Sequence, residues 1–410
     1  MMDRIERLAQ ISAYPWNLTR RVFSPKQAEA EALVRGWMEE AGLAVQYDPA
    51  GNLIGRIEGS VSGGPAVVIG GHIDTREDAC RTDGTLGVLI GIAGVERVIQ
   101  SGVALQYAIE VVAFVEDAAG RFGPHRLGSK AMVGRLDPHV LDWDDAYNVT
   151  QRQAMQSHGL EPETITSAKR SAGAILAYLE VAAEAGPVLE QARSPIGVVE
   201  ALSTSAILRV TLMGQTVSAE TVPMAGRRDT LAGTAACILA AERIGSARED
   251  VTVTVVRVDI APAPAFVVAG STTFGVLVHA SDDATRRATV EDLDAAFQEI
   301  ARRRGLEIGI EHSVDPDATR CNPRIVHLFE RAVEASGHPV VRLAQGAMTD
   351  AINMALLAPI GSALIRCRGG VGWGPGGIVD AADVEIGLKV LSHVISALAS
   401  GGNTRSVTGE

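Results

Sequence analysis

The chain has 410 residues, of which 47% are hydrophobic and 21% charged, and its formal net charge is −12. This length exceeds one ordinary hydrophobic core and predicts a soluble globular protein of two domains. The acidic balance argues against nucleic-acid binding, because phosphate contacts need a stripe of lysine and arginine side chains that this sequence lacks.

The segment from Met1 to Arg7 contains no apolar signal region, and no apolar run is long enough to span a bilayer. The cysteines follow neither a disulfide framework nor a metal-binding spacing; they are Cys80, Cys237, Cys321 and Cys367. We therefore expect a cytoplasmic protein with reduced thiols, no membrane association and a disordered tail over 401–410.

The first half of the chain alternates strands and helices, as an open α/β sheet does. Ser24-Pro25-Lys26-Gln27 reads as a capping box with proline at the first helical position, which predicts a helix to about Glu40. The next predicted elements are two short strands within 46–56, a buried strand at 66–70, a helix at 85–101 and a strand at 104–115. Polar residues that follow the two longer strands are candidate site residues, because open sheets bind ligands at the carboxyl ends of their strands.

The stretch 205–315 has a different order of predicted strands and helices. Its predicted elements are a strand at 206–213, a helix at 229–244, strands at 251–258 and 272–279, a helix at 290–304 and a strand at 306–311. Thr289 is the expected cap of the second helix and Gly305 its expected stop. This β-α-β-β-α-β order predicts a split, ferredoxin-like domain.

The chain then returns to the first domain. The predicted elements are a helix at 323–335, a strand at 340–343, a helix from 350, a strand at 362–366 and a last helix from about 383. We expect residues 1–204 and 316–400 to form one α/β domain, with 205–315 inserted in it.

Several short stretches, spread over nearly the whole length, together resemble one family. They are Ser24-Pro25-Lys26-Gln27, Asp48 to Arg56, Gly71-His72-Ile73-Asp74-Thr75, Arg81-Thr82-Asp83-Gly84, Arg121-Phe122-Gly123-Pro124, Leu127 to Met132, Gly186 to Glu190, Pro223-Met224 with Arg227-Arg228-Asp229, and Asp350-Ala351. The chain resembles the M20-type amidohydrolases, in the branch of N-carbamoyl-L-amino acid hydrolases and allantoate amidohydrolases. The resemblance implies a zinc-peptidase-like open sheet flanked by helices, with 205–315 as a lid through which the protein forms a homodimer.

In that family an aspartate bridges two metal ions, and a glutamate acts as general base on the metal-bound water. By motif position, the resemblance implies that His72 is the first imidazole ligand and Asp83 the bridge. It implies that Asp74 orients His72 and that Glu116 is the base. Asp117 stands where the family has a second glutamate, and its side chain is one methylene shorter.

The remaining histidine ligands of the family are missing, because their positions hold Ala182 and Trp373. Neither side chain can donate a lone pair to zinc, and a catalytic zinc normally has three protein ligands. We therefore expect no dinuclear centre and no cofactor, or at most one weakly bound zinc or manganese. The weak candidate ligands are His72, Asp83 and Asp117.

The family's substrate-contacting positions are also altered. Ser218 replaces the histidine that would polarise the scissile carbonyl, and His279 replaces the arginine that would clamp a substrate carboxylate. Trp373 either plugs the vacant metal cage or forms a wall against an apolar substrate, and we favour the wall because alanine or methionine replaces several other polar residues. The candidate substrate-binding residues are Trp373, Ser218, Glu184, His279 and Asp350.

Without metal, the carboxylates of the site would crowd together, which raises carboxyl pKa values. Arg76 follows the His72 motif where the family has an apolar residue. One hypothesis is that its guanidinium partly replaces the lost metal charge. The alternative is that Arg76 points to solvent and pairs with Glu77 or Asp78.

Three functions remain open. The first is a metal-independent enzyme that acts on a C–N or related bond of a small, rather apolar substrate, by hydrolysis, condensation or cyclisation in a specialised pathway. Its catalytic residues would be Glu116 as general acid/base, with His72, Asp83 and Asp117 around it. The second is a carbamoylase-like hydrolase with one weak metal, and the third is a non-catalytic relative that binds a small molecule or a partner chain. We favour the first.

Overall fold

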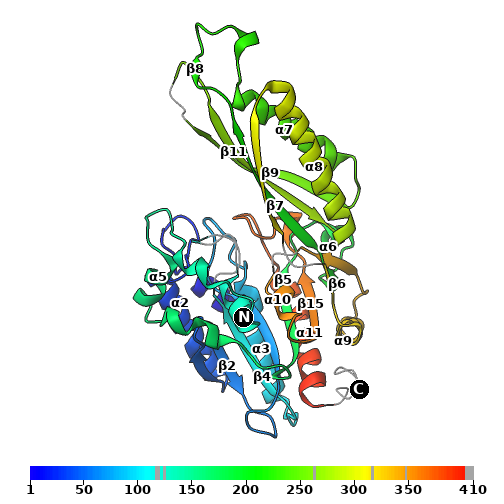
Figure 1. Ribbon diagram of the computed structural model, residues 1–410. Helices are drawn as coiled ribbons and strands as arrows, with labels where there is room; N and C mark the ends of the chain where they lie inside the picture. The colour runs from blue at the N-terminus through cyan, green and yellow to red at the C-terminus, as the bar shows by residue number, and fades with distance from the viewer. Residues whose placement is uncertain (116–120, 123–125, 262–264, 315–317, 347–348, 402–410) are drawn as a thin grey trace. The chain divides into compact units, whose positions relative to one another are not determined.

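The computed structural model describes residues 1–115, 121–122, 126–261, 265–314, 318–346 and 349–401. The chain divides into two compact units (Figure 1). Unit 1 comprises Met1–Glu200, Arg320–Leu343 and Met348–Glu410, and unit 2 comprises Ala201–Thr319 and Ala344–Ala347. The interval 205–315 expected for the second domain lies inside unit 2.

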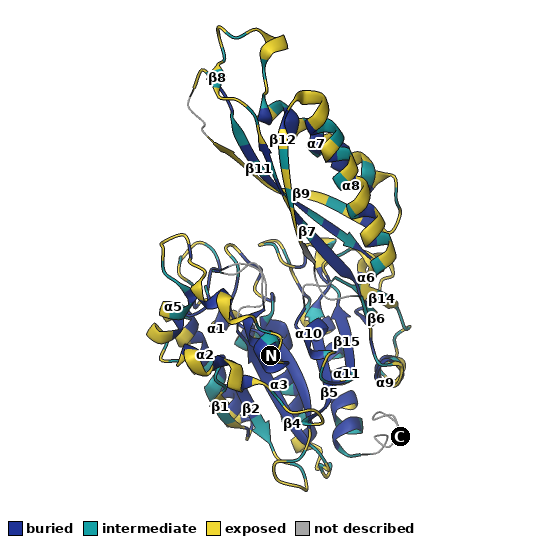
Figure 2. Cartoon of the chain, viewed as in Figure 1, coloured by how far each residue is buried: buried dark blue, intermediate teal, exposed yellow. Residues whose placement is uncertain are grey.

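The first sheet is mixed, with strand order β1-β2-β4-β3-β5-β15-β6-β13, and β14 pairs with β6. Its strands are β1 (Ala44–Tyr47), β2 (Leu53–Ile57), β3 (Ala66–His72), β4 (Ala108–Phe114), β5 (Ile175–Ala183), β6 (Ile196–Leu202), β13 (Thr319–Arg320), β14 (Arg342–Gln345) and β15 (Ile360–Ile365). The central pairings of β3 with β4, β3 with β5 and β5 with β15 are parallel. The predicted open α/β sheet is confirmed. Its parallel strands β3, β4 and β15 are buried along their whole length, and β5 is buried except at Ala182, as Figure 2 shows.

Helices flank this sheet. The helices of unit 1 are α1 (Met2–Ala9), α2 (Pro25–Glu40), α3 (Thr85–Gln100), α4 (Leu127–Met132), α5 (Gln151–Ser157), α6 (Val188–Gln191), α9 (Pro323–Ala335), α10 (Ala351–Met354) and α11 (Ala381–Ala399), with short 3-10 turns at Pro138–Asp142, Pro162–Ala168 and Arg368–Gly370. The apolar helix α3 packs on β3 and against α11. The close approach depends on Gly87, where an added Cβ would lie 2.8 Å from the Gly70 carbonyl oxygen. Within the described ranges, no helix combines the length and the apolar character needed to span a lipid bilayer.

Unit 2 is a separate α/β layer. Its elements are β7 (Thr204–Met213), β8 (Val217–Ser218), a 3-10 turn at Met224–Gly226, α7 (Thr230–Ser246), β9 (Val251–Ala261), β10 (Val267–Val268), β11 (Ser271–Ala280), α8 (Asp283–Arg304) and β12 (Glu307–Val314). The main sheet has the order β12-β7-β11-β9 with antiparallel pairs throughout. This confirms the split, ferredoxin-like prediction, and Phe274 of β11 meets Phe297 of α8 edge to face in the core.

The predicted start of α2 is confirmed, but its capping box and the predicted start of α8 need correction. Ser24 does cap α2 by accepting a hydrogen bond from the Gln27 amide at 3.2 Å, but the buried Gln27 Oε1 has no hydrogen-bond partner, so the capping box is only half formed. Helix α8 begins at Asp283 rather than 290, because Asp282 accepts hydrogen bonds from the first amides of the helix. Thr289 lies inside the helix, and its hydroxyl donates to the Thr285 carbonyl.

Arg20 fixes the loop that follows β3. Its side chain is fully buried; Nε donates to the Ile73 carbonyl at 2.6 Å, and Nη1 donates to two carbonyls of the N-terminal segment. The Arg20 backbone also exchanges hydrogen bonds with Thr75. Burial lowers the Arg20 pKa to about 10, while the nearby Asp74 charge opposes this shift, so the guanidinium stays charged at neutral pH.

Replacing Arg20 by methionine should lower the free energy of unfolding by about 3 kcal/mol, because several buried carbonyls lose a charged donor together. Chemical denaturation followed by circular dichroism measures this change. Arg21→Met is the matched control, since Arg21 is the neighbouring arginine and pairs with the exposed Glu77. An equal loss of stability in both variants would contradict the assigned role of Arg20.

Candidate active site

His72 is the last residue of β3, so the sheet delivers its imidazole to the carboxyl edge of the parallel strands. The ring lies against the turn that begins α3. At Gly84, whose φ is +66°, an added Cβ would lie 2.2 Å from the His72 ring. This position therefore requires glycine both for its backbone conformation and for the space that the imidazole occupies.

Asp74 contacts the His72 ring through its backbone. The Asp74 backbone carbonyl lies 2.9 Å from His72 Nδ1, whereas the nearer carboxylate oxygen lies at 3.8 Å. Because a carbonyl oxygen can only accept, Nδ1 carries the proton and Nε2 faces Asp83. The Asp74 carbonyl thus sets the direction of the ring, and the Asp74 carboxylate is buried beside it.

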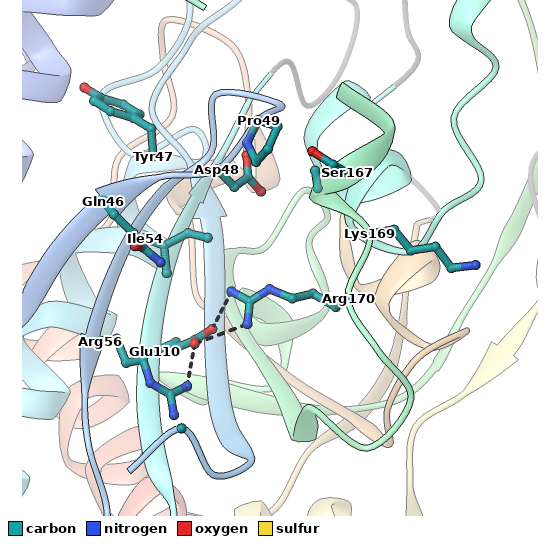
Figure 3. A pocket seen from close by; sticks show the side chains of 12 residues that line it. Gln46, Tyr47, Asp48, Pro49, Ile54, Arg56, Glu110, Ser167, Lys169 and Arg170 are labelled. Atoms are coloured by element: carbon teal, nitrogen blue, oxygen red, sulfur yellow. Dashed lines mark hydrogen bonds and ion pairs between the residues drawn. The ribbon is translucent and has the colours of Figure 1, made fainter. Parts of the chain in front are cut away.

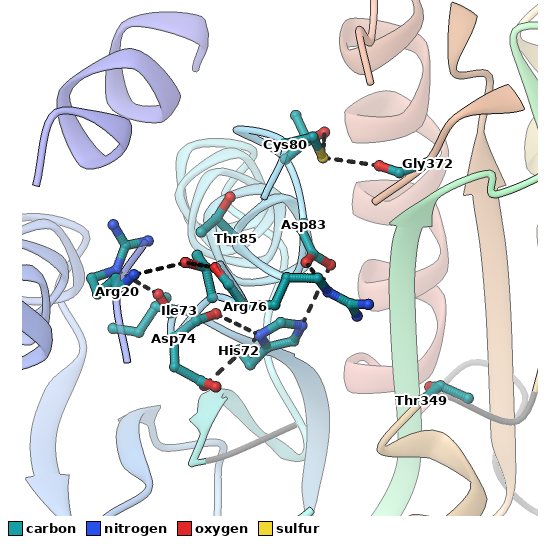
Figure 4. Close-up of polar contacts among 12 residues, drawn as sticks. Arg20, His72, Ile73, Asp74, Arg76, Cys80, Asp83, Thr85, Thr349 and Gly372 are labelled. Carbon is teal, nitrogen blue, oxygen red and sulfur yellow. Dashed lines mark hydrogen bonds and ion pairs between the residues drawn. The ribbon is translucent and has the colours of Figure 1, made fainter. Parts of the chain in front are cut away.

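Asp83 is the centre of the described cluster (Figure 4). Its carboxylate is buried, with Oδ1 3.9 Å from His72 Nε2 and Oδ2 3.3 Å from Arg76 Nε. The Arg76 guanidinium carbon in turn lies over the Trp373 ring, 5.3 Å from its centroid. Glu77 pairs with Arg21 instead. Arg76 is therefore placed between the predicted bridging carboxylate and the aromatic ring that replaces a ligand.

The Trp373 segment is tied to the loop that carries Arg76. The Cys80 amide donates to the Trp373 carbonyl at 3.1 Å, and the Cys80 thiol donates to the Gly372 carbonyl at 2.9 Å. Burial raises the pKa of the Cys80 thiol, which keeps it protonated and able to donate. Cys80 is thus a buried structural thiol that fixes the ring above Arg76, rather than a nucleophile.

Two further predicted positions, Ala182 and Glu184, lie at the carboxyl end of β5. Ala182 is half-buried on β5 opposite Leu364, where it supplies no donor. Glu184, expected to contact substrate, is buried, and its carboxylate accepts hydrogen bonds from the amides of Val188 and Leu189. Burial raises the Glu184 pKa, and these two amides counteract that shift. The described contacts give Glu184 the task of holding the Gly-Pro turn before α6.

Sequence reasoning missed the buried carboxylate of Glu180. It accepts hydrogen bonds from the Tyr178 hydroxyl at 2.8 Å and from the Thr349 hydroxyl, and Thr349 also accepts from the Ala351 amide. This network fixes the segment that contains the buried Asp350, at the start of α10. The available signal was a single acidic residue in the middle of an otherwise apolar strand.

The remaining predicted residues cannot be placed at this cluster. Glu116 and Asp117 lie outside the described residues. Ser218 and His279 belong to unit 2, where Ser218 is exposed in β8 and His279 Nδ1 lies 3.2 Å from the Ser205 hydroxyl. Their roles as catalytic and substrate-binding residues stay predictions.

The described donors do not fit a dinuclear zinc centre. In the described part of the chain, no group of three or more histidine, cysteine, aspartate or glutamate side chains could hold a metal ion. Ala182 and Trp373 have no lone pair for zinc. At Asp83, the oxygen not directed at His72 is contacted by a guanidinium, whose positive charge opposes a dication on the same carboxylate.

A cavity of about 430 Å³ is lined by other residues of unit 1 (Figure 3). Its polar wall is the buried Glu110, which pairs with Arg56 at 2.7 Å and with Arg170 at 3.2 Å. The Glu110 carboxylate is therefore already paired with two arginine side chains. The cavity contains none of the predicted catalytic side chains.

Known proteins are similar to this chain in sequence and in fold. The profile of Peptidase family M20/M25/M40 matches residues 68–397. An N-carbamoyl-L-amino acid amidohydrolase of Geobacillus stearothermophilus is 31% identical over 98% of each chain, and an allantoate deiminase of Arabidopsis thaliana is 31% identical over 96% of this chain and 81% of its own. The crystal structure of an amidase of the hydantoinase/carbamoylase family from Burkholderia vietnamiensis superposes with a TM-score of 0.90, at 26% identity over 97% of this chain and 96% of its own. The parallel sheet, the His72 loop and these matches together show that the chain belongs to peptidase family M20/M25/M40.

Proposed function

We propose that this protein transforms a C–N bond, of the amide or ureido kind, in a small and rather apolar substrate by metal-independent acid–base catalysis. The relatives named as amidohydrolases and deiminases support C–N hydrolase chemistry. Hydrolysis is the simplest reaction; condensation and cyclisation in a specialised pathway are related reactions of the same bond.

The contact between Arg76 and Asp83 carries the metal-independent part of the proposal. A buried carboxylate needs a partner of opposite charge, and here a guanidinium is in contact with it. The guanidinium carbon also lies over the Trp373 ring, 5.3 Å from its centroid, so a cation–π attraction helps to hold Arg76 beside Asp83. Arg76 thus supplies part of the positive charge that metal ions supply in a dinuclear amidohydrolase.

The acid–base work falls to Glu116 in this proposal. Glu116 takes a proton from water while the water oxygen attacks the carbonyl carbon, and it returns that proton to the nitrogen as the C–N bond breaks. His72 is the proposed partner, since its Nε2 faces the Asp83 carboxylate. Asp117 is proposed beside Glu116, and Asp350 and Trp373 in the substrate pocket.

One specific observation favours a second candidate, a hydrolase with a single weak metal. His72 Nε2 and Asp83 Oδ1 lie 3.9 Å apart, and both atoms are of a kind that binds zinc or manganese. Such a site would have fewer protein ligands than catalytic zinc normally has. A non-catalytic binding relative is the remaining alternative.

We propose further that unit 2 forms a homodimer, with no nucleic-acid or membrane partner. Strand β9 is an edge of its sheet, and it exposes Val256, Val258 and Ile260. Helix α7, which packs beside β9, exposes Leu231 and Leu239. A second copy that pairs β9 with β9 would satisfy the strand edge and cover these apolar side chains.

Metal analysis tests the proposal against its one-metal alternative. Protein purified without chelator should contain much less than one zinc or manganese per chain, and turnover of amide or ureido substrates should survive EDTA. Glu116→Gln should abolish this turnover, by a factor of about 100 or more, because the proton acceptor is removed. Stoichiometric metal together with EDTA-sensitive turnover would overturn the proposal, and ligand binding without turnover that Glu116→Gln leaves unchanged would favour the non-catalytic alternative.

Arg76→Ala should leave the Asp83 carboxylate without its cation. We expect the free energy of unfolding to fall by about 1–2 kcal/mol and zinc uptake to rise. Arg81→Ala is the matched control, because Arg81 lies in the same loop and pairs with the exposed Glu6. Unchanged stability and unchanged metal content in Arg76→Ala would refute the charge-replacement role.

The double substitution Val258→Lys with Ile260→Lys should convert the homodimer into a monomer, because it places charges on the proposed interface. Light scattering coupled to size-exclusion chromatography measures the mass. Arg257→Lys with Asp259→Glu, at the intervening positions, keeps the charges and should leave the dimer intact. A wild-type protein that is monomeric at micromolar concentration would rule out this proposal.

A further inference from the structure

We infer that Arg76 is also an anion receptor: its free Nη edge binds the carboxylate of a small substrate whose apolar or aromatic arm packs beside Trp373. This inference rests on the proposed function, because it names the substrate class of the same site. In the family, the resemblance implies that an arginine of the lid domain, at the position of His279, binds the substrate carboxylate. The inference assigns this role to Arg76 of unit 1 instead.

The first step is the hydrogen-bonding capacity of the guanidinium. Arginine has five N–H donors, and Nε–H alone is engaged by Asp83. Among the described residues, neither Nη group has a hydrogen-bond or ion-pair partner, although the side chain is only 27% exposed. A half-buried guanidinium with unused donors is suited to a ligand with two coplanar oxygens, which is the geometry of a carboxylate.

The second step is the fixed orientation of this edge. Asp83 holds the Nε side, and the guanidinium carbon lies over the Trp373 ring, 5.3 Å from its centroid. The ring itself is held through the two hydrogen bonds of Cys80 to Gly372 and Trp373. Less freedom is therefore lost on binding than for a flexible surface arginine, which increases affinity.

The third step is the chemical character of the surroundings. Trp373 is 37% exposed, so part of its ring remains available beside the guanidinium. The matching ligand is a monocarboxylate with a flat or apolar arm, such as an aryl-substituted acid.

Isothermal titration calorimetry with phenylacetate and with 2-phenylethanol tests the inference. The two probes share the aromatic arm and differ in the carboxylate, and neither has a C–N bond that the protein could cleave. The full-length protein should bind phenylacetate about tenfold or more tightly than the alcohol, since a charge-assisted bidentate pair gives this discrimination. Arg76→Gln should abolish the preference, and Arg76→Lys should reduce it, because lysine keeps the charge but not the planar fork. Trp373→Ala should weaken the binding of both probes.

The matched control is Arg81→Gln, which removes the same charge from the same loop and should keep the preference. Thermal unfolding establishes that each variant is folded; if Arg76→Gln is not, Arg76→Lys and Trp373→Ala decide. A wild-type protein without preference, or a preference that survives in Arg76→Gln, overturns the inference. If EDTA removes the preference for phenylacetate, a bound metal binds the carboxylate, and this result also overturns the inference. The two probes do not react, so this test is independent of turnover. Absence of the carboxylate preference in a protein whose turnover resists EDTA would reject this inference alone. Failure of the proposed function would instead appear as metal-dependent turnover.

Discussion

The ion pair between Arg76 and Asp83 is the contact on which the candidate site depends. A carboxylate as buried as Asp83 is costly unless a cation or strong donors accompany it. Here the cation comes from the chain itself, seven residues before the carboxylate, and a tryptophan lies over it. The site therefore keeps positive charge beside Asp83 without needing a complete set of metal ligands.

The rest of unit 1 holds this pair in place through backbone contacts more than through side chains. Arg20 holds the carbonyl of Ile73, the Asp74 carbonyl sets the His72 ring, and Cys80 holds two carbonyls of the Trp373 segment. Backbone groups are present whatever residue occupies a position. Such a scaffold can exchange its reactive side chains while the loops keep their course, which is how one fold accommodates different chemistry.

Much of the fold was predictable because local signals agree with it. The buried run before His72 forms the predicted strand, although that strand extends to His72, and the glycine stop at Gly305 ends α8 as predicted. The start of α8 was mispredicted because two residues can cap a helix there, and hydrogen-bond geometry alone selects Asp282 over Thr289. Within the site, motifs located His72 and Asp83. The contact of Arg76 with Trp373 joins distant parts of the chain, so no fixed spacing in the sequence predicts it. Sequence patterns also do not encode side-chain directions, and these determine the contact of His72 with the Asp74 carbonyl and the hydrogen bonds of Glu180.

The contact between Arg76 and Trp373 has a consequence for the design of a metal site at Asp83. Replacing Trp373 by histidine would remove the ring beside the guanidinium, yet it would leave that cation against the Asp83 carboxylate. A second histidine at position 182 would still leave the repulsion between the guanidinium and a metal ion on the same carboxylate. An engineered metal site would therefore need coordinated changes at positions 76, 182 and 373.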